Sequence, residues 1–86
     1  MTIFDVVAQY PRRWKRIDEC RAIVEDFAQK LNKARRQLKK THEQFALDNE
    51  ISPSRIYNLC RGQVLPSNDE LEILMPIINA FDKEIT

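Results

Sequence analysis

The sequence predicts an all-α fold, a compact bundle of five helices (four to six) that includes an N-terminal helical extension. Three observations predict it. The 86 residues include a single glycine and no run of alternating Val, Ile or Thr, which argues against β-sheet. Apolar residues recur at steps of three and four, the period of an amphipathic helix. Ser or Thr followed three positions later by Asp, Glu or Gln recurs along the chain and is typical of helix starts.

The chain is short enough for one domain, which we divide into three parts. Residues 1–27 are the helical extension, residues 28–81 the helical core and residues 82–86 a tail. Thr2 and Asp5 are spaced to cap a first short helix. Its buried side chains are expected to be Ile3, Phe4, Val7 and Tyr10.

After Pro11, a long helix is expected from about Arg12 to Lys40, either continuous or bent near Asn32. Its apolar positions alternate steps of three and four, which is a heptad pattern; they are Ile17, Cys20, Val24, Phe27, Leu31, Ala34 and Leu38. This seam either packs into the core of its own domain or, in its front half, forms a dimer surface together with Phe4, Val7 and Trp14. Core packing is favoured for residues 31–38, and both interpretations stay open for residues 17–27.

Residues 12–16 form a basic cluster around Trp14. An aromatic ring among cations can stack on a nucleic-acid base. A single Trp at helical spacing from Ile17 is more often part of a core, however, and we favour burial.

The stretch from Thr41 to Ser67 predicts a helix, a tight turn and a second helix. Thr41 and Gln44 form a capping box, and Asn49 with Glu50 interrupts the apolar run. Ile51 then returns the chain to the core.

The second helix, residues 53–60, has a defined start and end. Ser52 is a good N-cap, Pro53 suits the first helical position, and Gly62 falls where a helix needs a left-handed residue. Ile56 and Leu59, three apart, form its buried stripe. The side chains that must then face outward are Pro53, Ser54, Tyr57, Asn58 and Arg61, with Arg55 at the margin. A further capping box, Ser67 with Glu70, begins the last helix, which Pro76 should end or kink near Leu74 or Met75.

Charge is distributed unevenly along the chain. The formal net charge is only +1, but residues 1–40 carry 11 Lys or Arg and 5 Asp or Glu, a net of +6, whereas residues 41–86 carry 3 and 8, a net of −5. No acidic residue occurs between Ile51 and Asn68, as a surface that meets phosphates requires. The basic residues that lead into the two helices are Lys33, Arg35, Arg36, Lys39 and Lys40. For Lys39 and Lys40 we favour a phosphate contact over a solvated face, and for Lys33 and Arg36 both interpretations stay open.

An ordered set of residues carries a resemblance to a known family. Its members are Thr41, Glu43, Phe45, Ala46, Ile51, Ser52, Ser54, Ile56, Arg61, Gly62, Pro66, Ser67, Leu71 and Leu74. Together they resemble the phage-repressor and Cro type of helix-turn-helix proteins, often called Xre-like, over roughly residues 31–78. The chain departs from that pattern in four places. Asn49 stands where a buried aliphatic is usual, Glu50 where the turn often has Gly, and Pro76 inside a helix that is normally unbroken. Cys60 stands where an acid often pairs with an Arg of the preceding helix, which leaves Arg35 without that partner.

The resemblance implies a cytoplasmic regulator that binds double-stranded DNA in a sequence-specific way and is expected to be a homodimeric repressor. Helix 53–60 would enter the major groove. The implied contacts to base edges come from Ser54, Arg55, Tyr57 and Asn58. The contacts expected to hold phosphates come from Lys39, Lys40, Thr41, His42, Ser52, Arg61 and Gln63. Such dimers read two half-sites about 34 Å apart, and either residues 1–27 or the helix from Ile73 to Phe81 could form the dimer surface.

Other functional classes receive less support from the sequence. Cys20 and Cys60 lie far apart with no CxxC, which together with one His makes a zinc site unfavourable; both are expected to be buried thiols. We expect no metal, no cofactor, no catalytic activity and no membrane span. Two alternatives stay open. The chain could be an antitoxin or phage- or plasmid-encoded regulator whose residues 1–27 bind a partner protein, or a protein-interaction module that has lost DNA binding.

Overall fold

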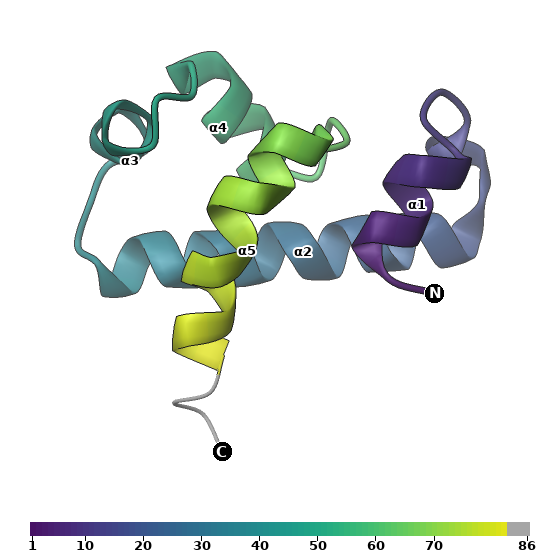
Figure 1. Ribbon diagram of the computed structural model, residues 1–86, viewed down its shortest axis with the longest axis horizontal. Coiled ribbons are helices and arrows are strands. Elements are labelled where there is room, and N and C mark those ends of the chain that lie inside the picture. Colours follow the sequence, from purple (N-terminus) through teal and green to yellow (C-terminus); the bar gives the residue numbers. More distant parts are fainter. Residues whose placement is uncertain (83–86) are drawn as a thin grey trace.

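The computed structural model describes residues 1–82, which form a compact all-α globule of five helices without strands (Figure 1). The prediction of a compact, all-α bundle of five helices is therefore confirmed. The elements are α1 (Ile3–Gln9), a 3₁₀ turn η1 (Trp14–Arg16), α2 (Asp18–Gln37), α3 (His42–Asp48), α4 (Pro53–Cys60) and α5 (Asn68–Asp82).

The long helix α2 is the axis of the molecule, and the other elements pack around it (Figure 1). The purple helix α1 lies over the N-terminal half of α2, and α5 crosses α2 near its middle. Helices α3 and α4 pack closely on each other, and α4 also contacts α2. The α3–α4 pair and α1 therefore pack against different parts of α2.

The heptad seam of α2 packs into the core of its own chain. Cys20, Val24, Phe27, Leu31 and Ala34 are all buried, and the two cysteines of the chain are buried free thiols as predicted. Core packing is therefore what the structure shows for residues 20–34, whereas Leu38, which was expected in the core, is 39% exposed. Trp14 is also buried, with 7% of its surface exposed, so the favoured interpretation of the basic cluster is confirmed.

Three helices end in the same way, which fixes the short connections between them. At the ends of α2, α3 and α4 a residue with positive φ closes a Schellman motif; these residues are Lys39 (φ 57°), Glu50 (φ 56°) and Gly62 (φ 70°). After α3, for example, Ile51 N–H donates to the Ala46 carbonyl at 3.0 Å. The capping boxes predicted at the helix starts are all present, from Thr2, Thr41 and Ser67.

Helix α1 buries Ile3 and partly buries Val7 and Tyr10 as predicted, but the prediction for Phe4 is wrong and Val6 takes its place in the core. Phe4 is 47% exposed, and Val6 is fully buried together with Ile3. The reason is helical geometry, since Ile3, Val6 and the half-buried Tyr10 lie three and four apart on one face, whereas Phe4 is turned away from it.

The bounds of two other helices also differ from the expectation. The long helix begins at Asp18 rather than Arg12, because the 3₁₀ turn at Trp14 and the extended backbone of Ile17 (φ −111°, ψ 110°) precede it. Helix α5 does not end near Leu74 but continues through Pro76 to Asp82, a residue predicted to lie in the tail; the rest of that predicted tail, residues 83–86, lies outside the described residues. Pro76 is exposed, so water can bond the carbonyl of the previous turn that loses its donor. No helix within residues 1–82 is both long and apolar enough to span a membrane.

Candidate nucleic-acid interface

The turn between α3 and α4 brings the starts of these two helices together. Thr41 Oγ1 accepts a hydrogen bond from the Gln44 N–H at 3.1 Å at the start of α3. Ser52 Oγ accepts one from the Arg55 N–H at 3.2 Å at the start of α4, and Pro53 follows at the first helical position. Each cap fixes where its helix starts, and therefore which side chains of the first turn face solvent.

Tyr57 is the centre of the exposed face of α4. Tyr57 is 47% exposed, and its ring and the His42 ring form a T-shaped pair with the centroids 5.4 Å apart and the planes at 74°. The Arg61 guanidinium carbon lies 5.2 Å from the centre of the Tyr57 ring, within cation–π range. The three side chains therefore form one group that joins α3 to the C-terminal end of α4.

A shallow hollow lies between the starts of the two helices. Its lining residues are Thr41, His42, Glu43, Pro53, Ser54 and Tyr57. Four of them, Thr41, His42, Ser54 and Tyr57, belong to the contact residues predicted from the sequence, which the structure brings together although they come from two helices. Glu43 was not predicted here; its exposed carboxylate lines the same hollow.

The pKa of His42 is lowered from its ordinary value of 6.5. Burial of the ring lowers the pKa, and the nearby positive charges of Arg35 and Arg36 lower it further. His42 is therefore neutral at pH 7 and can act as a hydrogen-bond donor through one ring nitrogen without carrying a charge.

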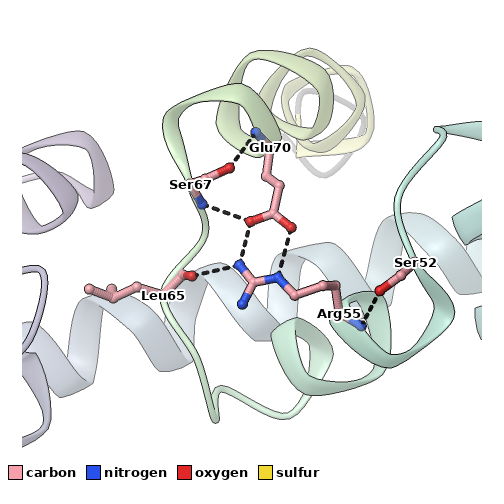
Figure 2. A network of polar contacts seen from close by, with 5 residues as sticks. All are labelled: Ser52, Arg55, Leu65, Ser67 and Glu70. Carbon is pink, nitrogen blue, oxygen red and sulfur yellow. Dashed lines mark hydrogen bonds and ion pairs between the residues drawn. The ribbon is translucent and has the colours of Figure 1, made fainter.

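Arg55 lies at the margin of the outward face as predicted, but its guanidinium, expected to contact a base edge, is bonded within the protein. Figure 2 shows its guanidinium facing Glu70 of α5, with Nε donating to Glu70 Oε2 at 3.0 Å and Nη2 donating to both Glu70 Oε1 and the Leu65 carbonyl. Ser67 N–H also donates to Glu70 Oε1, at 2.7 Å. The Arg55 side chain therefore ties α4 to the start of α5, which sequence reasoning missed.

Burial and hydrogen bonding shift the pKa of Glu70 in opposite directions. Burial raises the pKa of the Glu70 carboxyl, but the hydrogen bonds from Arg55 and Ser67 outweigh it and hold the pKa below the ordinary value of 4.5. The hydrogen bond to Glu70 correspondingly raises the pKa of Arg55. Both groups are therefore charged at neutral pH. The Glu70 half of this link was visible in the sequence as a capping box, but nothing there indicated that Arg55 would reach it.

The other residues predicted to contact phosphate lie around this face, and they differ in exposure and in the bonds that their side chains already make. Lys39 and Gln63 are exposed just beyond the ends of α2 and α4. Lys40 Nζ forms an ion pair with Asp48 of α3, and its carbonyl accepts a hydrogen bond from Arg35 Nη1 at 2.7 Å. Ser52 is exposed, with its hydroxyl engaged in the α4 cap. The Lys40 pair is largely solvent-exposed and therefore weak enough to exchange for another anion.

An amide links α2 to the end of α4, where the sequence lacks an acid for Arg35. Asn32 Nδ2 donates to the Cys60 carbonyl at 2.8 Å, and Arg35 Nη2 donates to Asn32 Oδ1 at 3.4 Å. Burial raises the pKa of the Cys60 thiol, and the nearby Arg35 partly opposes that shift. The thiol is therefore protonated at neutral pH, and α2 is linked to the end of α4 through the Cys60 carbonyl rather than through its side chain.

Searches against family models, curated proteins and solved structures each returned no match to this chain. Within residues 1–82, no group of three or more His, Cys, Asp or Glu side chains is placed to hold a metal ion. The function is therefore argued from the residues of the α3–α4 face and their geometry.

Proposed function

We propose that the chain is a double-stranded DNA-binding regulator of the phage-repressor and Cro type, acting as a homodimeric repressor that places α4 in the major groove. The observation that carries the proposal is the outward face of α4. It presents Ser54, Tyr57, Asn58 and Arg61 beside His42 of α3, without a carboxylate of its own. A short polar helix with hydroxyl, amide, aromatic and guanidinium groups suits the major groove, where base edges offer both donors and acceptors.

The roles divide by chemistry. Ser54, Tyr57 and Asn58 read base edges, with the Asn58 amide able to pair with adenine in two hydrogen bonds. The residues that contact the phosphates of the DNA backbone are Lys39, Lys40, Thr41, His42, Ser52, Arg61 and Gln63. Arg55 is left out of the base-reading set, because Glu70 and the Leu65 carbonyl already occupy its guanidinium. It acts instead by holding α4 on α5.

Electrostatics support a weak hold on phosphates rather than a strong one. The net charge is +1, and Glu43 lies in the hollow beside His42. The favourable charge comes from Arg61 on α4 and from the basic end of α2, whose Arg35 and Arg36 act on His42. Because the phosphate term is small, we expect weak non-specific binding and a large share of the affinity to come from base contacts.

The test is selection of binding sites from a random pool of double-stranded DNA with the purified chain at about physiological salt, where non-specific binding is weak. We expect enrichment of a two-fold symmetric sequence with half-sites about one helical turn apart. A folded sample that enriches no sequence would contradict the proposal and favour a module that binds protein instead.

A further inference from the structure

A second binding surface lies away from the α3–α4 face. It is an open apolar hollow between α1, α2 and α5, and none of its lining residues belongs to the Tyr57 hollow. Its apolar lining comes chiefly from Met1, Phe4, Ile23, Phe27, Met75 and Ile78. The two candidate dimer elements of the sequence, residues 1–27 and the helix around residues 73–81, thus meet in one surface.

Two large apolar side chains at this hollow face solvent. Met1 is 51% exposed and Phe4 is 47% exposed, and Ile23 and Met75 are each partly exposed beside them. Exposed apolar groups that gather around a hollow cost free energy in water and mark a site that another molecule covers.

We infer that a second copy of this chain covers the hollow, in a two-fold symmetric contact between the α1–α2–α5 faces. An isologous interface needs a projection and a recess on the same face, so that each copy fills the other. Here Phe4 projects beside the recess that it helps to line. The inference deepens the proposed function and rests on it for the choice of occupant, since a two-fold symmetric DNA reader needs a self-complementary surface.

The charged rim of the hollow suits the same symmetry. Asp26 and Lys30 both line it, one helical turn apart on α2, with Lys30 Nζ 3.2 Å from Asp26 Oδ2. A two-fold axis that crosses α2 between them places Asp26 of one copy opposite Lys30 of the other, twice over. Unlike charges then meet across the rim, as complementary interfaces require.

The shape of the molecule provides enough area. The chain is a flat body of 33 × 31 × 19 Å with an accessible surface of 5736 Å². A stable interface buries about 800 Å² per partner, which is a modest share of that surface and fits on one broad face. Because the Tyr57 hollow shares no residue with this face, the dimer leaves both α4 helices free for DNA.

The first experiment is sedimentation velocity of the DNA-free chain over a range of micromolar concentrations. We expect a concentration-dependent dimer, and we expect Phe4→Glu to weaken it by about tenfold or more, because a charge replaces an apolar projection at the centre of the contact. The matched control is Leu47→Glu on α3, whose side chain is 74% exposed outside the hollow and should leave the dimer unchanged. Circular dichroism confirms that each variant is folded.

The second experiment reverses the rim charges and does not disturb the apolar contact. Asp26→Lys and Lys30→Glu each place like charges across the axis, so each variant alone should dimerise about tenfold more weakly. An equal mixture of the two restores unlike pairs on both sides and should form a heterodimer in preference to either homodimer.

The outcomes separate this surface from the proposed function. A dimer indifferent to both Phe4→Glu and the charge reversals would overturn the surface and leave the proposed function standing. A monomeric parent chain would overturn the surface and the homodimeric part of the proposed function, while DNA selection would still test DNA binding itself. A dimer that responds as expected but enriches no DNA would support the surface and contradict the DNA-binding role. Recovery of a partner protein with a monomeric chain would assign the hollow to that partner instead.

Discussion

Tyr57 shows how one side chain can be exposed and yet held in place. Tyr57 is 47% exposed, but its contacts with the His42 ring and with the Arg61 guanidinium restrict its motion. A ring that is already oriented loses less conformational entropy when it binds than a free one. At the same time the cluster keeps Arg61 beside the helix rather than dispersed in solvent, which sets where a phosphate can meet it.

Removing the Asn58 amide and removing the Arg61 guanidinium are expected to change DNA binding in different ways. Asn58→Ala should cost about 1–3 kcal/mol of binding free energy on the selected site and relax the preference at one base pair. Arg61→Ala should weaken binding to all sequences alike and lower the slope of log K against log salt by about one. Titrations of matched and single-mismatch duplexes at several salt concentrations measure both. Uniform weakening by Asn58→Ala would remove it from the base-reading set.

The Arg55–Glu70 link should appear in the dependence of stability on pH. The folded pKa of Glu70 lies below 4.5, so the link stabilises the fold above that pH and is lost as the pH falls through the folded pKa. Glu70→Gln should lower the free energy of unfolding by about 1–3 kcal/mol at pH 7, because Arg55 loses a charged partner, and should flatten the loss of stability on acidification.

Denaturant unfolding at a series of pH values measures this effect, and Glu72→Gln is the matched control. Glu72 lies two residues after Glu70 on the same helix and is exposed, so its replacement should change the free energy of unfolding little at any pH. If Glu70→Gln lost as much stability on acidification as the parent chain, other carboxylates would be responsible.

At the scale of the helix, stability depends on how each helix stops. The left-handed residue that closes α4 is glycine, but α2 and α3 use Lys39 and Glu50 at the same place. A residue with a Cβ is strained in this conformation by about 1–2 kcal/mol. The turn between α3 and α4 is therefore formed at a cost in stability that the sequence could avoid.

Glu50→Gly should raise the free energy of unfolding by about 0.5–1 kcal/mol, since the gain at φ 56° exceeds the added flexibility of the unfolded chain. Gly62→Ala should lower it by about 1 kcal/mol. The new Cβ there would meet Ala28 Cβ at 3.7 Å, an ordinary contact, so the loss would come from the backbone. Glu50→Gln separates the charge from the backbone effect, and a stabilisation by Glu50→Gln equal to that of Glu50→Gly would refute the explanation.

The helix boundaries show which features a sequence can predict. Caps such as those of Thr41 and Ser67 join residues three apart, so the pattern alone locates them. The start of α2 was misplaced because Trp14 reaches the core from a 3₁₀ turn, a choice made by packing. The candidate site divides in the same way. The face of α4 follows from helical period, whereas the Arg55–Glu70 contact spans 15 residues and depends on where α5 crosses.

At the scale of the whole molecule, the two hollows are lined by different helices. The Tyr57 hollow involves only α3 and α4, and the apolar hollow involves only α1, α2 and α5. Helix α2 contacts both α1 and α4, and so it fixes the distance between the two surfaces (Figure 1). A dimer through the apolar hollow would therefore hold its two α4 helices at one fixed separation.

That rigidity predicts a strict spacing of half-sites in the selected DNA. Insertion of about five base pairs between them rotates one half-site by half a turn, so only one α4 can engage at a time. The affinity of the parent chain should fall to that of an isolated half-site, because the gain from simultaneous binding is lost. Phe4→Glu should bind the intact site at the same reduced affinity and be indifferent to the insertion. Gel-shift titrations of both proteins on both duplexes measure this, and a parent chain that tolerated the insertion would bind DNA without a rigid two-fold contact.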